Sequence, residues 1–182
     1  MNEPMNLLRR KAEIICKLHR KEESYPEIVA QLAALLQREP NSESEEIIKG
    51  KEIAMYMFEL LTEFHLPQEQ IVENQTAFMG LFSESLKDKQ ARVRAATFKA
   101  MTKFLTSIED EDLVLQYKSQ MNGLLDIVVE VLQKDEEQGK ESLETLIELT
   151  STFGEIWNDS TEKLIFVCSE VMKNTDFEDG PR

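Results

Sequence analysis

Glycine and proline are scarce in this sequence, with six Gly and five Pro among 182 residues. That is too few for the many turns of a β-sandwich or a β-barrel. Glu, Lys, Gln, Leu, Ala and Met fill the space between them, and all of these residue types favour helices. Because 41% of the residues are hydrophobic, a long disordered chain is disfavoured. The composition therefore predicts an all-α fold.

Residues that commonly build chemical sites are equally few. Cys16 and Cys168 stand alone within apolar helical patterns, which predicts buried, reduced thiols and no disulfide framework. His19 and His65 lie far apart, and neither has a Cys or a carboxylate at metal-ligand spacing. The glycines are isolated, so no glycine-rich phosphate-binding loop is present. We therefore expect no catalytic, cofactor-binding or metal-binding residues, and a protein that is not an enzyme.

Basic residues are outnumbered, because 21 Lys and Arg face 35 Asp and Glu, giving a formal net charge of −14. A surface this acidic repels phosphate backbones, so direct nucleic-acid binding is disfavoured. It attracts basic proteins, although solubility alone explains a similar charge. No apolar run is long enough to span a bilayer, so we expect no membrane partner.

Apolar residues recur at intervals of three and four along the whole chain, which indicates amphipathic helices. Pro26 occupies a first-turn position of one helix, while Pro40 and Pro67 mark helix ends. The pattern predicts eight helices joined by short links in one domain, with residues 174–182 as a turn and tail. The expected helices cover about residues 6–20, 26–39, 44–64, 68–86, 92–107, 112–133, 140–156 and 160–172.

The expected helices form pairs that resemble one another. Residues 58–64 match residues 98–104 at an offset of 40, and residues 86–88 and 132–135 end corresponding helices. Two helices in roughly 40–47 residues are the period of HEAT and armadillo arrays, whose units must stack to bury their apolar faces. The sequence therefore predicts a HEAT-repeat α-solenoid of about four stacked antiparallel helix pairs. A compact bundle with accidental internal similarity is the alternative.

A more specific motif than the helix spacing is formed by Asp88, Val93 and Arg94. Their order resembles the HEAT signature, in which an Asp closes the first helix of a pair and a Val-Arg step opens the second. The resemblance implies a structural role for these residues, with Asp and Arg paired along the solenoid in a charge-assisted contact. The same six-residue step recurs from Asp176 to Arg182.

Three further segments resemble importin-β-type karyopherins, in particular the importin-five subgroup. They are residues 8–14 (Leu-Arg-Arg-Lys-Ala-Glu-Ile), 25–28 (Tyr-Pro-Glu-Ile) and 143–149 (Leu-Glu-Thr-Leu-Ile-Glu-Leu). The resemblance implies a nuclear import receptor of the cytoplasm and nucleus, without a cofactor. Its implied partners are basic cargo proteins, the Ran GTPase in its GTP form, and the phenylalanine repeats of nucleoporins. A HEAT scaffold of a phosphatase or ubiquitin-ligase assembly, and an enzyme with a helical-bundle site, are the alternatives.

The same resemblance implies that residues 1–182 are one HEAT-repeat segment excised from a longer solenoid. The helices expected at residues 6–20 and 160–172 then lack a neighbour. We expect them to expose apolar residues such as Ile15, Phe166 and Val167. Exposed apolar patches of this kind favour self-association.

Glutamates form rows on two of the expected second helices, because they recur at intervals that return to one helix face. Apolar residues, Ile147 among them, should take the opposite side. We expect both rows to bind a basic partner, with a plain solvated face as the alternative. The predicted partner-binding residues are Glu52, Glu59 and Glu63 on the first of these helices, and Glu141, Glu144, Glu148 and Glu155 on the second.

Overall fold

A computed structural model describes residues 3–19, 25–37, 42–63, 66–134 and 136–173. Every regular element within these ranges is a helix, so the predicted all-α class is confirmed. The chain divides into two compact units, Met1–Glu109 and Asp110–Arg182. Each unit has its own set of buried apolar side chains.

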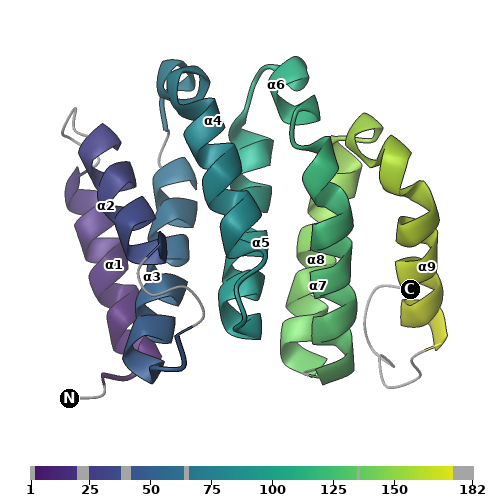
Figure 1. Ribbon diagram of the computed structural model, residues 1–182, viewed down its shortest axis with the longest axis horizontal. Coiled ribbons are helices and arrows are strands. Elements are labelled where there is room, and N and C mark those ends of the chain that lie inside the picture. The colour runs from purple at the N-terminus through teal and green to yellow at the C-terminus, as the bar shows by residue number, and fades with distance from the viewer. Residues whose placement is uncertain (1–2, 20–24, 38–41, 64–65, 135, 174–182) are drawn as a thin grey trace. The chain divides into compact units, whose positions relative to one another are not determined.

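The first unit contains five helices among its described residues, arranged in two layers (Figure 1). One layer holds the second helices of the pairs, with α3 packed against both α1 and α5. The other layer holds the first helices, with α2 packed on α3 and α4 packed on α5 and α2. The bounds are α1 Met5–His19, α2 Tyr25–Gln37, α3 Glu45–Glu63, α4 Gln68–Ser85 and α5 Ala91–Ser107.

A cluster of phenylalanines joins three helices of the first unit. Phe58 of α3, Phe78 and Phe82 of α4, and Phe104 of α5 are almost fully buried. Their ring centroids lie 5.1 to 5.8 Å apart in edge-on or tilted pairs. Each such pair contributes about 0.5–1.5 kcal/mol beyond the burial of its area. The cluster therefore fixes the outer helix α4 against the inner helices α3 and α5.

The second unit is built around α7, which packs against α8 and α9. Gly139 permits the close approach of α8, because an added Cβ would lie only 3.3 Å from the Leu132 Cα of α7. The inner face of α7 is fully buried and apolar. In order, the described elements are α6 Glu111–Leu115, η1 Lys118–Gln120, α7 Met121–Lys134, α8 Glu136–Thr152, η2 Glu155–Ser160 and α9 Thr161–Lys173.

The prediction of one helix over residues 112–133 is wrong. The α-helix is interrupted between α6 and α7, where the backbone forms the shorter-range hydrogen bonds of a 3₁₀ helix. The amide of Tyr117 donates to the Val114 carbonyl at 3.0 Å, three residues back, and η1 follows. Val114, Tyr117 and Met121 are all buried at intervals of three and four. A continuous helix has the same intervals, so the hydrophobic pattern does not reveal the break.

Equivalent helices recur at a regular interval. The first helix of each pair, or the short helix that opens it, begins at residues 25, 68, 111 and 155. The second helices begin at residues 5, 45, 91 and 136. The intervals of 40 to 46 residues between these starts are within the range of HEAT and armadillo units. The predicted repeat of helix pairs is therefore confirmed within each unit.

Candidate partner-binding surface

The residues of the HEAT-like signature hold the turn between α4 and α5, although not by the expected pair. The Asp88 carboxylate lies 2.7 Å from the Lys51 ammonium of α3, and these side chains are only 9% and 4% exposed. Arg94 donates instead to the backbone carbonyls of Asp88 and Lys89, at 2.6 and 3.0 Å. The expected partner was wrong because α3 packs beside α5 and brings Lys51 to this turn. Val93 is buried at the same position.

Asp176 and Arg182, the second copy of the signature, lie outside the described residues. His65 lies outside them as well, and the His19 side chain is likewise not described. Over the described part of the chain, no group of three or more His, Cys, Asp or Glu side chains could hold a metal ion.

The glutamate row on α3 is partly engaged by the neighbouring helix α5. The half-buried Glu52 has its carboxylate 3.4 Å from the Arg92 guanidinium of α5. Burial raises the pKa of Glu52, against the lowering effect of Arg92. Arg92 also donates to both carboxylate oxygens of Glu45, each at 2.9 Å. Glu59 is half-buried, and Glu63 alone in this row is exposed. Within the predicted row, Glu52 therefore joins α3 to α5, whereas Glu63 faces solvent.

The glutamate row on α8 is more open, and it contains an apolar residue. Glu141 and Glu144 are exposed, Glu148 is half-buried, and Ile147 is 51% exposed. Placing Ile147 on the opposite side of the helix was wrong. Leu146 and Leu149 define the buried face, and a rotation of 100° per residue leaves Ile147 beside Glu144 on the outer one. We name Glu141, Glu144, Ile147 and Glu148 the α8 strip.

Glu155 does not belong to this strip, contrary to expectation. Helix α8 ends at Thr152, and Glu155 opens η2 after Phe153 and Gly154. The amide of Phe153 still donates to the Leu149 carbonyl at 3.1 Å, but the chain then leaves the helix axis. A spacing of seven residues places two side chains on one face only when the helix is unbroken between them.

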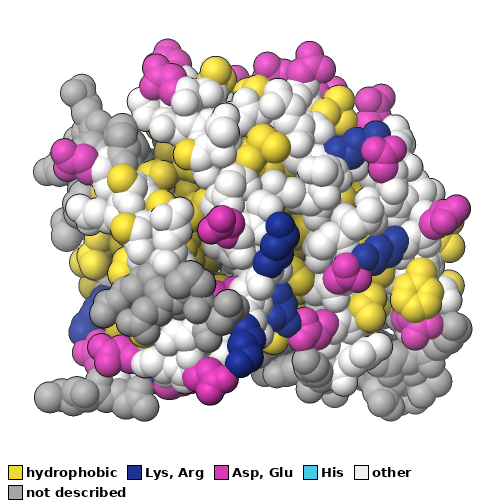
Figure 2. Space-filling model, viewed as in Figure 1, with side chains coloured by type: hydrophobic (Ala, Val, Ile, Leu, Met, Phe, Trp, Pro, Cys, Tyr) yellow, Lys and Arg dark blue, Asp and Glu magenta, His cyan; other side chains and the backbone are white. Residues whose placement is uncertain are grey.

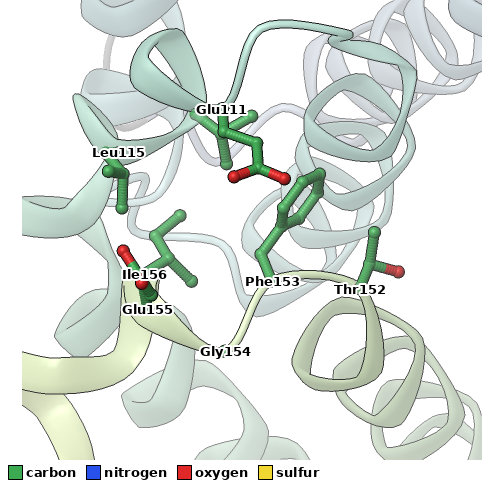
Figure 3. Close-up of a pocket in the computed structure, with 8 residues that line it drawn as sticks. Glu111, Leu115, Thr152, Phe153, Gly154, Glu155 and Ile156 are labelled. Atoms are coloured by element: carbon green, nitrogen blue, oxygen red, sulfur yellow. The ribbon is translucent and has the colours of Figure 1, made fainter.

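Glu155 instead lines a pocket of about 220 Å³ in the second unit. Figure 3 shows the Glu111 carboxylate directed toward the ring of Phe153, which comes from the end of α8. We name this cavity the Phe153 pocket. Its other lining residues include Leu115, Thr152 and Ile156. No sequence motif indicated it, because its walls come from segments about 40 residues apart.

The negative charge of the chain is concentrated in the second unit. Residues 110–182 contain 18 of the 35 acidic residues but only 6 of the 21 basic ones, so they carry −12 of the net −14. Two of these six, Lys118 and Lys163, are already paired with Asp159 and Asp126, at 3.0 and 2.6 Å. Figure 2 shows acidic side chains outnumbering Lys and Arg on the visible face. The excess of carboxylates gives this unit a strongly negative electrostatic potential.

Apolar residues are exposed on α1 and α9, as expected for Ile15 and Phe166. The expectation for Val167 was wrong, because this side chain is 1% exposed and faces the unit interior. The adjacent Cys168 is exposed, contrary to the expected burial, whereas Cys16 is buried. The helical rotation of α9 explains both errors, since burying Val167 turns its neighbour outward.

No helix in the described ranges is both long enough and apolar enough to cross a bilayer. A family model described as "IPO5-like, TPR repeats" matches residues 8–175 of the chain. No curated protein and no solved structure matches the chain. The family match covers nearly all of the helix pairs described above.

Proposed function

Because the chain belongs to the importin-5-like repeat family, we propose that it is a protein-binding scaffold of a nuclear transport receptor whose cargo is basic. The family supplies the class of protein, which is an importin-type scaffold. The observation that carries the proposal for the cargo is the α8 strip on a unit with a net charge of −12.

The α8 strip combines two kinds of contact. Glu141 and Glu144 offer exposed carboxylates to lysine or arginine side chains, and such rim charges steer association and set its salt dependence. Ile147 offers exposed apolar area beside Glu144, which supports a contact that persists at high salt. A basic amphipathic segment of a cargo protein matches both features. We propose that it lies along α8.

The remaining steps of the proposed function follow from family membership. The receptor would release its cargo when it binds the Ran GTPase in the GTP form. Grooves between first helices would take phenylalanine repeats of nucleoporins, and the protein would move between cytoplasm and nucleus. The role is binding without catalysis or a cofactor. Binding of a phenylalanine-repeat peptide would distinguish this function from a phosphatase or ubiquitin-ligase scaffold.

Charge reversal tests the role of the α8 strip. We expect Glu141, Glu144 and Glu148 changed together to Lys to weaken binding of a synthetic lysine- and arginine-rich peptide roughly tenfold, at about 0.5 kcal/mol per rim charge. The dependence of affinity on salt concentration should become shallower as well. A matched control changes Glu46, Glu69 and Glu73 to Lys, exposed positions in the first unit.

The control keeps the total charge equal, so an equal loss in both variants would mean that net charge alone drives binding. A separate Ile147→Ser variant removes the apolar contact. We expect it to weaken binding while leaving the salt dependence unchanged. Unchanged affinity in the triple variant, with the helical signal intact, would overturn the assignment of the α8 strip.

A further inference from the structure

The Phe153 pocket adjoins the α8 strip at the end of the same helix. Thr152, which lines the pocket, lies one turn beyond Glu148, and its hydroxyl donates to the Glu148 carbonyl at 2.9 Å. A segment that follows the α8 strip therefore reaches the pocket within one further helical turn. The residues that line the pocket determine which side chain of that segment it would accept.

The two carboxylates at the pocket have no resident cation. Glu111 and Glu155 are both exposed, and neither has an ion-pair partner among the residues that the structure describes. Figure 3 shows the Glu111 carboxylate beside Phe153 and directed into the cavity. A positive group entering the pocket would form charge-assisted contacts with the Glu111 oxygens, and Glu155 adds negative charge at the pocket wall.

The end of α8 adds a second source of negative potential. This helix has 17 residues and ends at Thr152, on the wall of the pocket, and no basic side chain stands in its last turn. The carbonyl end of a helix carries roughly half a negative charge and favours cations. Helix α8 itself therefore places no basic side chain at the position that its carbonyl end favours for a cation.

The ring of Phe153 completes the environment. An aromatic face attracts a cation within about 6 Å of the ring centre, and a planar guanidinium stacks on it better than a compact ammonium. Leu115 and Ile156 supply apolar walls for the methylene groups of the same side chain. A free divalent metal ion fits less well, because it needs more oxygen ligands than two separate carboxylates provide.

We propose that the Phe153 pocket holds one arginine side chain of the basic partner, with lysine as the weaker ligand. This inference rests on the proposed function, in that the arginine belongs to the segment bound along the α8 strip. The pocket fixes the position of that segment, since a single guanidinium held there selects one register among several equivalent placements of positive charge along the strip.

The test uses the whole chain and single-side-chain probes. N-acetyl-arginine amide should shift the backbone amide resonances of residues 153–156 in NMR spectra, in a saturable manner. The citrulline analogue, which has nearly the same shape without the charge, should not. Changing Glu111 and Glu155 together to Gln should weaken arginine binding about tenfold. Glu162→Gln, an exposed glutamate of the same unit outside the pocket, should leave it unchanged.

Equal responses to arginine and citrulline, or shifts spread evenly over the acidic surface, would overturn the pocket assignment. So would full arginine binding by the Glu111 and Glu155 variant. Phe153→Leu provides a second check, since it keeps apolar volume and should still weaken binding. Failure of the arginine test leaves the proposed function intact if charge reversal on the α8 strip still weakens peptide binding. The reverse result would remove the proposed function and retain an arginine site.

Discussion

The buried pair between Lys51 and Asp88 makes a strong prediction about stability. The two charged groups are 2.7 Å apart, and their side chains are 4% and 9% exposed. Asp88 also accepts a hydrogen bond from the Gln90 amide at 2.9 Å, which caps the turn before α5. Replacing Asp88 with Ala removes both contacts and leaves a buried ammonium without its carboxylate.

The expected cost follows from the degree of burial. Breaking a buried ion pair by removing one partner costs about 3–5 kcal/mol, because the remaining charge keeps its desolvation penalty. Lys51 makes a further interaction besides this pair, so we expect about 3 kcal/mol. The double variant Lys51→Met, Asp88→Ala removes both charges and should be closer to the wild type than Asp88→Ala alone.

Urea denaturation followed by circular dichroism measures these differences. Because the chain divides into two compact units, the unfolding of the first unit should be followed separately, for example by hydrogen exchange of its buried backbone amides. Asp159→Ala serves as a control, since its pair with Lys118 is largely exposed and should contribute less than about 1 kcal/mol. A cost below about 1 kcal/mol for Asp88→Ala, or a double variant worse than the single one, would refute the reasoning.

Two further predictions concern ionisable groups. Cys168 is exposed, while Cys16 is buried and burial raises its pKa to about 11; a thiol reagent should therefore modify one thiol rapidly in the native chain, and Cys168→Ser should abolish that phase. A fast phase that survives in Cys168→Ser would contradict this. Burial and a hydrogen bond to Glu13 raise the pKa of Tyr56 to about 12, above its ordinary value of 10.0. This stabilisation is complete below pH 10 and is lost as pH rises from about 10 to 12. Tyr56→Phe should reduce the loss, measured by denaturation at several alkaline pH values, and an identical pH dependence would argue against it.

Hydrophobic periodicity predicted most of the fold, because each helix buries a face that recurs every three or four residues. It failed where the backbone changes without changing that interval, as it does around Tyr117 between α6 and α7. It also identified Asp88 as structural without finding its partner. Lys51 lies 37 residues earlier, and only the packing of α3 against α5 brings the two together.

The sequence predicted that the candidate site contains a row of glutamates on α8, but it did not predict every residue of that row correctly. The glutamates of α8 were found from their spacing, yet Ile147 was assigned to the wrong face and Glu155 to the wrong element. A one-residue difference in the rotation of a helix reverses such assignments, because neighbouring residues point 100° apart. The Phe153 pocket could not be predicted from the sequence, because Glu111 lines it only as a result of the packing of α6 against η2.

The two units differ in their balance of charge. We expect this difference to distinguish residues that stabilise the fold from residues that bind a partner. In the first unit 17 acidic and 15 basic residues nearly balance, and pairs such as Lys51–Asp88 and Arg92–Glu45 join its helices. In the second unit the carboxylates exceed the available cations threefold, so internal pairing cannot neutralise them. Such an excess costs self-repulsion within a folded unit. A basic partner relieves this cost, whereas a further internal contact cannot, so we expect substitutions in the first unit to alter stability and those on the α8 strip to alter binding.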